Sequence, residues 1–143
     1  EYTHSMLNST GDDNALFKSG PAHGAPPQNV RLGANDFLLD HLGGGFDLLY
    51  FTDAPAVPDA LQQVIQQARK QGLPIKVIAV GASQPVAGAD KTLPDADGHL
   101  RQRYGVPANG GAYLLRPDQH ICARWLTLDA TRLQAALTTA LPQ

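Results

Sequence analysis

Apolar positions in the middle of the chain alternate between strand-like and helix-like patterns. Residues 46–51 and 75–80 are nearly continuous apolar runs, which is typical of strands covered on both faces. Between them, one apolar stripe recurs at the spacing of a helix face: Leu61, Val64, Ile65 and Ala68. A strand, a helix and a second strand in this order predict a βαβ unit, with parallel strands and a right-handed crossover.

The residues that flank this helix pattern indicate where it starts and stops. Pro58 has a fixed backbone angle that suits a first helical turn, and the Asp59 carboxylate suits the positive end of the helix dipole. Gly72 suits the turn that ends a helix. We expect residues 53–58 and 81–94 to form loops.

A β-hairpin is predicted in the second half of the chain. Residues 112–115 and 119–125 flank Arg116-Pro117-Asp118, and proline suits the second position of a type I turn. Such a hairpin pairs its two strands in antiparallel fashion.

Short helices are expected on both sides of the hairpin. Before it, Asp97 can cap a helix over 100–104 that stops at Gly105 and Pro107. After it, Asp129 can cap a terminal helix that Pro142 ends. The apolar stripe of that helix is Leu133, Ala136, Leu137 and Ala140.

Residues 1–35 show little periodicity, because glycines and prolines interrupt them repeatedly. We interpret this stretch as an extended arm that comes from an upstream domain, and residues 36–143 as the folded domain. One helical turn is expected over 35–42, with Phe37, Leu38 and Leu42 as its apolar anchors. The three glycines that follow, 43–45, precede a strand, so they predict a turn and not a phosphate-binding loop.

The order of these elements predicts an α/β fold of the thioredoxin-like type, a mixed sheet with helices on both faces. The single cysteine, Cys122, excludes a CxxC redox centre. Residues 52–58, where thioredoxin-like enzymes carry their reactive thiol, contain no cysteine. Residues 109–112, where such folds carry a cis-proline, contain no proline. Cys122 falls in the middle of a predicted strand, which favours a small buried role.

Composition excludes several other classes of function. The chain has 143 residues, a formal net charge of −2 and a pI near 6.2, which argues against binding to nucleic acid or to an anionic membrane. No apolar run approaches the roughly 20 residues of a membrane helix, and no secretion signal is visible, so we expect a cytoplasmic protein. The chain begins with Glu1, which suggests a piece of a longer polypeptide.

Candidate metal and nucleotide sites are weak. The five histidines lack metal-site spacing, and no G-x-G-x-x-G fingerprint is present. Asp95, Asp97 and Gly98 resemble the start of a calcium loop, but Arg101 and Arg103 occupy positions that need acidic ligands.

A distinctive set of residues surrounds the predicted hairpin turn: Arg116, Pro117, Asp118, Arg124 and Trp125. Arginine can bind a carboxylate through two parallel hydrogen bonds, so one interpretation is contact with an anion or a partner. The favoured interpretation is structural, with a turn fixed by Pro117 and Asp118. Trp125 is expected to anchor the sheet to the last helix or to another domain.

Taken together, residues 45–49, 104–105 and 114–125 resemble the C-terminal domain of FAD-dependent aromatic hydroxylases of the phenol hydroxylase and 3-(3-hydroxyphenyl)propionate hydroxylase type. The stretch from Arg116-Pro117-Asp118 to Arg124-Trp125 is the most specific part. The segment 2–5 and the glycine- and proline-rich stretch 20–32 are also similar to the connection that precedes this domain. Gln119 departs from the family, in which a glycine often follows the aspartate.

The resemblance implies a thioredoxin-like domain without redox activity. The parent enzyme would hydroxylate a phenolic ring with FAD, NAD(P)H and O₂, and its cofactor and substrate residues would lie upstream. No catalytic, cofactor or metal residue is therefore expected in this chain. Its partners would be the upstream FAD- and substrate-binding domains and, in some relatives, a second copy in a homodimer. Candidates for an exposed apolar docking patch are Leu7, Leu16, Phe17 and Trp125.

Two other functions remain open at this point. One is a stand-alone peroxiredoxin-like thiol oxidoreductase that uses Cys122, although a thiol in mid-strand lacks activation by a helix dipole. The other is a small-molecule-binding module that keeps a thioredoxin-type cleft.

Overall fold

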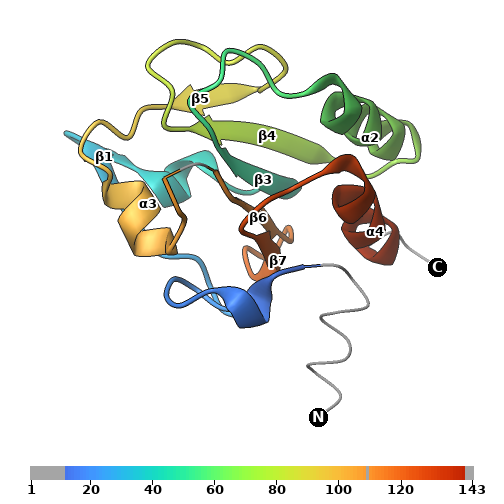
Figure 1. The fold of residues 1–143 in the computed structure, drawn as a ribbon, viewed down its shortest axis with the longest axis horizontal. Coiled ribbons are helices and arrows are strands. Elements are labelled where there is room, and N and C mark those ends of the chain that lie inside the picture. The colour runs from blue at the N-terminus through green and yellow to red at the C-terminus, as the bar shows by residue number, and fades with distance from the viewer. Residues whose placement is uncertain (1–11, 109, 141–143) are drawn as a thin grey trace.

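The computed structural model describes residues 12–108 and 110–140, which form a five-stranded mixed sheet with helices on both faces (Figure 1). The strands of the sheet are β3 (Phe46–Phe51), β4 (Ile75–Val80), β5 (Lys91–Leu93), β6 (Ala112–Leu115) and β7 (Ile121–Trp125). The α-helices are α2 (Asp59–Lys70), α3 (His99–Tyr104) and α4 (Ala130–Ala140). The expected α/β fold with helices on both faces of a mixed sheet is confirmed.

The strand order β5-β4-β3-β6-β7 places the predicted βαβ unit at the centre of the sheet. β3 and β4 are parallel and connected through α2, as the sequence predicts. β6 runs antiparallel to β3, and β7 runs antiparallel to β6, so the predicted hairpin is also confirmed. This order and these directions are those of a thioredoxin-like sheet, extended at one edge by β5.

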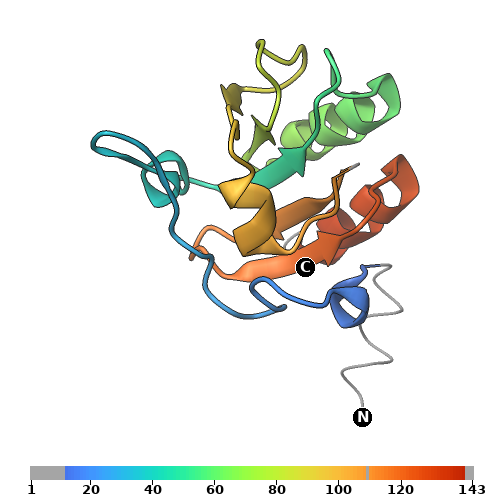
Figure 2. The same ribbon diagram turned by 60° about the vertical axis from the view of Figure 1, so that its left-hand side comes forward.

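One face of the sheet is covered by α2 and α4, which lie side by side (Figure 2). Apolar side chains of both helices pack on it because their stripes recur at helical spacing. The buried residues that the helices contribute are Leu61, Ile65 and Ala68 from α2 and Leu133, Ala136 and Leu137 from α4. Trp125 of β7 is completely buried in this same apolar cluster. It therefore anchors the sheet to the helices and does not belong to an exposed apolar patch.

The opposite face is covered by shorter and less regular pieces. These are α3, the two 3₁₀ turns η1 (Asn14–Leu16) and η2 (Leu38–His41), and the small antiparallel pair β1 (Arg31–Gly33) and β2 (Asp36–Phe37). The chain before β1, residues 12–30, is called the N-terminal segment below. It lies along β7 and beneath α3 (Figures 1 and 2). Val30 is buried, and Phe17 packs against this second apolar cluster.

Several local predictions need correction. Leu38 and Leu42 anchor the turn near residue 40 as expected, but Phe37 is 37% exposed and does not. Residues 91–93, expected to lie in a loop, form edge strand β5, which is too short and polar to produce an apolar pattern. Pro142, which was expected to end α4, lies outside the described residues.

The cap of α3 also differs from the prediction. Asp95, and not Asp97, accepts hydrogen bonds from the backbone N–H groups of Leu100 (2.9 Å) and Arg101 (3.1 Å). Asp97 accepts only the N–H of His99, at 3.3 Å. Because Gly98 adopts a left-handed conformation (φ +76°) just before the helix, the chain turns and brings the earlier carboxylate over the helix start. The predicted stop at Gly105 is confirmed by its left-handed conformation.

Candidate functional site

The positions used for thiol chemistry in thioredoxin-like enzymes hold no cysteine in this chain. Residues 52–58 connect β3 to the start of α2. The Ala54 N–H donates to Thr52 Oγ1 (3.0 Å), and the Val57 N–H donates to the Ala87 carbonyl (2.8 Å). Facing this loop, Gly110 and Gly111 have positive φ angles, and the Phe51 N–H donates to the Gly111 carbonyl (2.9 Å). Asn109, in the segment where a cis-proline was sought, lies outside the described residues.

Cys122 lies in the middle of β7 and is partly exposed. Burial raises the pKa of its thiol, and the nearby carboxylates of Asp12 and Asp118 raise it further, while Arg116 lowers it. The thiolate is the reactive form of cysteine, so a raised pKa makes a poor nucleophile at neutral pH. This environment argues against the peroxiredoxin-like alternative.

The hairpin turn is built by its own residues, in line with the structural interpretation. Arg116 donates to both carboxylate oxygens of Asp118, each at 3.2 Å, and the His120 N–H donates to Asp118 Oδ1 (3.1 Å). The hydrogen bond from Arg116 is the largest cause that lowers the pKa of Asp118. Gln119 has a φ of +66°, the conformation that favours glycine, which explains why a glycine is common at this position in the family it resembles.

Arg124 is the centre of the polar contacts that hold the N-terminal segment. It is only 5% exposed, although it carries a charge. Its guanidinium donates to Asn14 Oδ1 (2.7 Å), to the Asn14 carbonyl (3.1 Å) and to the Ser19 carbonyl (3.1 Å). It also lies over the Phe17 ring, with its central carbon 4.3 Å from the ring centroid. One side chain of β7 thus binds three residues that lie more than 100 positions earlier in the sequence.

The backbone of β7 binds the same segment along its outer edge. The Asp13 N–H donates to the Arg124 carbonyl (2.8 Å), and the Arg124 N–H donates to Asp12 Oδ2 (3.2 Å). At the other end of the strand, the Gly24 N–H donates to the Ile121 carbonyl (2.7 Å), and the Ile121 N–H donates to the Ala25 carbonyl (2.8 Å). The N-terminal segment therefore covers an edge that would otherwise expose unpaired backbone groups.

Two buried tyrosines extend this network into α3. Tyr113 of β6 accepts a hydrogen bond from Arg124 (3.3 Å) and donates to the Tyr104 carbonyl, and Tyr104 donates to the Gln28 carbonyl. Burial raises the pKa of both phenols, so both remain neutral donors at physiological pH. Gly20 fits between them because a Cβ there would overlap the Tyr104 carbonyl and the Tyr113 hydroxyl.

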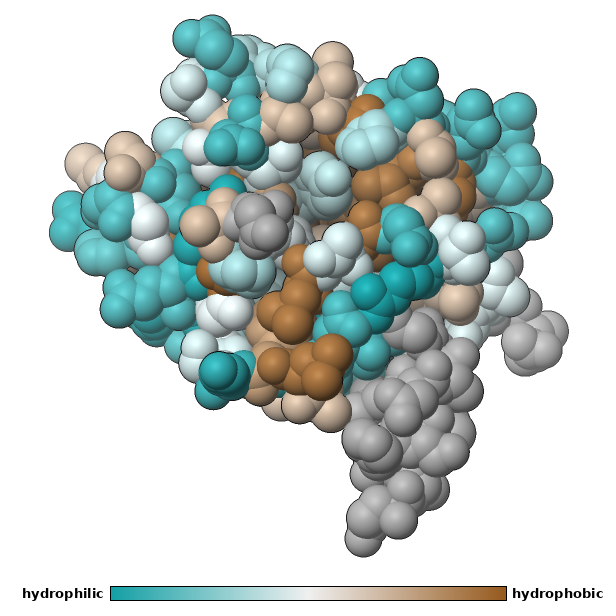
Figure 3. Space-filling view, viewed as in Figure 1, coloured by the Kyte–Doolittle hydropathy of each residue, from teal (hydrophilic) through white to brown (hydrophobic). Residues whose placement is uncertain are grey.

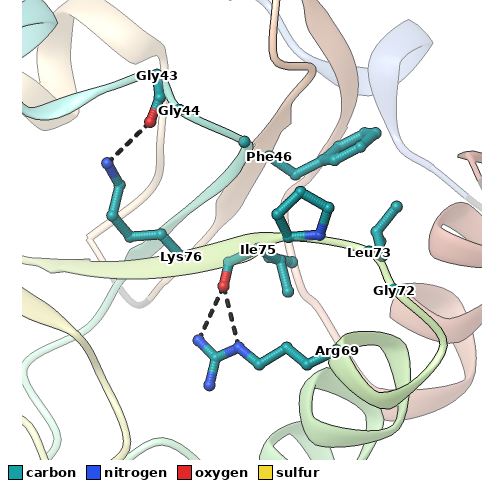
Figure 4. Close-up of a pocket in the computed structure, with 10 residues that line it drawn as sticks. Gly43, Gly44, Phe46, Arg69, Gly72, Leu73, Ile75 and Lys76 are labelled. Atoms are coloured by element: carbon teal, nitrogen blue, oxygen red, sulfur yellow. Dashed lines mark hydrogen bonds between the residues drawn. The ribbon is translucent and has the colours of Figure 1, made fainter.

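A hollow of about 600 Å³ lies at the amino-terminal ends of β3 and β4 (Figure 4). Its two cations are already engaged. Arg69 donates twice to the Ile75 carbonyl (3.0 and 2.9 Å) and forms an ion pair with Asp90 (2.9 Å). Lys76 donates to the Gly43 carbonyl (3.2 Å) and lies 3.3 Å from the carboxylate of Asp47. The Lys76 contact holds the backbone at Gly43, and Gly43 and Gly44 have positive φ angles (+104° and +80°), as expected for a glycine turn before a strand.

Asp47 is a fully buried carboxylate beside this hollow. Burial raises its pKa, although the Gly43 N–H, which donates to Oδ2 at 2.8 Å, and Lys76 both lower it. Side chains two residues apart in a strand point to the same face, so Asp47 points to the same face as Leu49 and Phe51. That face is the one covered by α3 and the N-terminal segment.

Metal and membrane sites were also sought. Within residues 12–108 and 110–140, no cluster of three or more His, Cys, Asp or Glu side chains could hold a metal ion. His41 instead lies 2.7 Å from Asp36, and His120 lies 3.3 Å from Asp118. None of the helices in the described part of the chain has the length and apolar character needed to cross a bilayer.

Sequence reasoning selected Arg124 but missed its partners. Asp12, Asn14 and Ser19 lie in the stretch that was interpreted as an arm of little regularity. The available signal was the arginine itself: a charged side chain in an apolar strand needs several acceptors when it is buried. The sequence shows that need but does not show which residues meet it.

Comparison with solved structures finds this fold within flavin-dependent enzymes. The chain resembles aklavinone-11 hydroxylase in a complex with FAD and aklavinone, with 25% sequence identity over 87% of this chain and a TM-score of 0.56. It resembles the flavin-dependent monooxygenase PieE with 22% identity over 85% of this chain and a TM-score of 0.58. It resembles the rebeccamycin biosynthetic enzyme RebC with 20% identity over 84% of this chain and a TM-score of 0.57.

The chain spans about a fifth of these proteins, 22% of the hydroxylase and 19% of PieE and of RebC. No protein-family model matches the sequence, and no curated protein matches it. The similarity to FAD-dependent hydroxylases that the sequence indicated is thus found again in the fold, which occurs in these enzymes as one part of a longer chain.

Proposed function

We propose that this chain is the C-terminal structural domain of an FAD-dependent aromatic-ring monooxygenase and that it does not catalyse the reaction itself. The parent enzyme, in the cytoplasm, would use NAD(P)H and O₂ to hydroxylate a phenolic substrate. The chain's own work would be to pack against the upstream FAD- and substrate-binding domains and, in a homodimer, against a second copy. In this proposal residues 1–35 connect to those domains, and residues 36–143 form the thioredoxin-like body.

The observation that carries the proposal is the shared fold with about a fifth of three flavin enzymes, in a chain without the thioredoxin thiol. The raised pKa of Cys122 supports the non-catalytic role, because the remaining thiol is poorly suited to redox exchange. The hairpin that carries the strongest sequence resemblance, residues 114–125, also supports it. It contains Arg124, which binds Asn14 and Ser19 of the N-terminal segment.

The test is to purify the full polypeptide that contains this chain. We expect bound FAD with its visible absorbance, oxidation of NAD(P)H that a phenol stimulates, and a hydroxylated product. The 143-residue chain alone should show none of these activities. Absence of flavin from the full polypeptide would contradict the proposal, as would NAD(P)H oxidation by the chain alone. A rise in the melting temperature of the isolated chain with phenols or FAD would instead favour the small-molecule-binding alternative.

A further inference from the structure

Leu16 is the most exposed large apolar side chain that the structure describes. It is 64% exposed, and the other exposed large apolar residue, Phe37, is 37% exposed. In the space-filling view, apolar atoms gather over η1, next to a strongly polar strip (Figure 3). Single exposed leucines are common on protein surfaces, so the exposure alone identifies no site.

The rigid attachment of η1 gives this exposure its meaning. None of the three residues of η1 is buried, so apolar packing does not hold the turn in place. The residues before Leu16 are held instead by polar contacts. The Leu126 N–H donates to Asp13 Oδ2 (2.9 Å), Arg132 forms an ion pair with Asp13, and Arg124 donates twice to Asn14.

On the other side of Leu16, Phe17 packs against Tyr113 with their ring centroids 5.6 Å apart. Leu16 thus lies between two anchored residues and points its side chain into solvent. Because the residues on either side are already held in place, covering Leu16 orders little additional backbone, which favours binding.

We infer that Leu16 is a docking contact for the part of the polypeptide that precedes this chain. This inference rests on the proposed function, which does not say which surface of the chain contacts the upstream domains. This chain covers only 22% and 19% of two flavin enzymes with this fold, which leaves most of their length for other domains. A domain connected through the N-terminal segment enters the described structure at Asp12, four residues before Leu16. Residues 1–15 separate such a domain from Leu16, and a tether of that length gives it an effective concentration on the order of millimolar at this surface.

The structure also indicates the chemistry of the partner surface. The Arg124 guanidinium and the carboxylates of Asp12 and Asp13 are already engaged within this chain. Leu16 itself offers only an apolar side chain, so the complement of this contact is an apolar surface or pocket. Interfaces between domains of one chain typically bury about 600–1,500 Å², which is enough to cover η1 completely.

Cysteine labelling in the full polypeptide tests this inference. Leu16→Cys and Phe37→Cys are compared, and the modified peptides are quantified by mass spectrometry, so that native cysteines do not interfere. In the 143-residue chain, Leu16→Cys should react with a maleimide faster than Phe37→Cys, because residue 16 is more exposed. In the full polypeptide, Leu16→Cys should react at least tenfold more slowly than in the 143-residue chain, whereas Phe37→Cys should change less than twofold.

Equal rates for Leu16→Cys in the two proteins would overturn the inference, and so would selective protection of Phe37→Cys. The FAD absorbance of the same preparation separates the two proposals. Flavin binding and hydroxylation together with an unprotected residue 16 would reject the docking contact and keep the proposed function. Protection of residue 16 without flavin would keep the docking contact and reject the proposed function.

Discussion

The two faces of the sheet reach similar burial in different ways. On one face, α2 and α4 place regular apolar stripes on β3, β4, β6 and β7. On the other face, one short helix, two 3₁₀ turns and the N-terminal segment make the cover. The side chains that bind this cover to the sheet are polar or amphipathic: Arg124, Tyr104 and Tyr113. The first cover is held by buried apolar area, whereas the second combines buried apolar residues such as Leu38 and Leu100 with directed hydrogen bonds.

This difference teaches how an irregular segment can be part of a core. A helix satisfies its own backbone groups, so it needs only an apolar stripe to bind a sheet. A segment without regular structure must find partners for its backbone N–H and C=O groups elsewhere. Here β7 and Arg124 supply many of those partners. The irregular face should therefore be sensitive to loss of single hydrogen-bonding side chains, and the helical face to loss of apolar volume.

The largest effect is expected for Arg124→Met, which keeps an apolar stem but removes the guanidinium. It removes the guanidinium donor from the Asn14 and Ser19 carbonyls and from the Tyr113 hydroxyl, and it leaves Asn14 Oδ1 with only the His23 N–H. We expect a loss of about 4 kcal/mol in unfolding free energy. Chemical denaturation measures the loss. Hydrogen exchange should show residues 12–19 opening first. The matched control is Arg116→Met in the exposed turn, which should cost less than about 0.5 kcal/mol.

A similar cost for the two arginine variants would mean that the polar contacts of Arg124 contribute little to stability. The comparison of the two faces would then fail, because the N-terminal segment would be held by its apolar residues alone.

On the helical face, Leu133→Ala should cost about 3 kcal/mol, since the side chain is fully buried and leaves a cavity. In contrast to Arg124→Met, this variant should lower the hydrogen-exchange protection of β3, β4 and α2 together. Selective opening of residues 12–19 in this variant would show that the two covers are not independent. The exposed Gln134→Ala on the same helix serves as the control.

A smaller effect is expected from pH, through Asp12 and Asp47. Burial raises the pKa of both carboxyls. The folded state therefore binds these two protons more tightly than the unfolded state. The free energy of unfolding should fall as pH rises from 3.8, the ordinary pKa of an aspartate, through the raised pKa of the folded state, and then level off. Asp47→Asn should remove the part of this fall that comes from Asp47. The stability of the variant relative to the natural chain should therefore improve as pH rises through this range. Urea denaturation at several pH values measures it, with the exposed Asp53→Asn as control.

The smallest effect is expected for Gln119→Gly in the hairpin turn. The φ of +66° strains a residue with a side chain and suits glycine. Part of that gain is offset because glycine has more freedom in the unfolded chain. We expect a net stabilisation of about 0.5 kcal/mol, measured by thermal or chemical denaturation, and no gain for Gln119→Ala. The Gln119 amide lies close to Gly43, where an added Cβ would meet its Nε2 at 3.1 Å. A loss of stability with glycine would show that this packing outweighs the backbone strain.

The sequence predicts the helical face of this fold well and the irregular face poorly. β3, β4 and α2 have the predicted ranges because each has an apolar pattern of its own. β5 was missed because three residues, two of them polar, give no pattern and pair only when β4 is present beside them. The cap by Asp95 was missed because it depends on a left-handed glycine between the carboxylate and the helix.

The candidate site shows the same limit. Arg116, Pro117 and Asp118 were predicted as a self-contained turn, and they form one because all their contacts are local. Arg124 was selected on the same evidence, but its contacts reach residues 14 and 19, beyond any local pattern. The most specific part of the resemblance to flavin-dependent hydroxylases is one continuous stretch, residues 114–125, which explains why it could be recognised without the fold.

The coverage of β7 by residues 12–25 has a consequence for engineering and for evolution by recombination. A chimaera that joins a foreign domain at residue 36 would keep all five strands of the sheet but would leave the outer edge of β7 bare and Arg124 without its acceptors. Such a graft should be prone to edge-to-edge aggregation. A graft that joins before Asp12 carries its own edge protection with it, so the transplantable module is longer than the sheet and helices alone suggest.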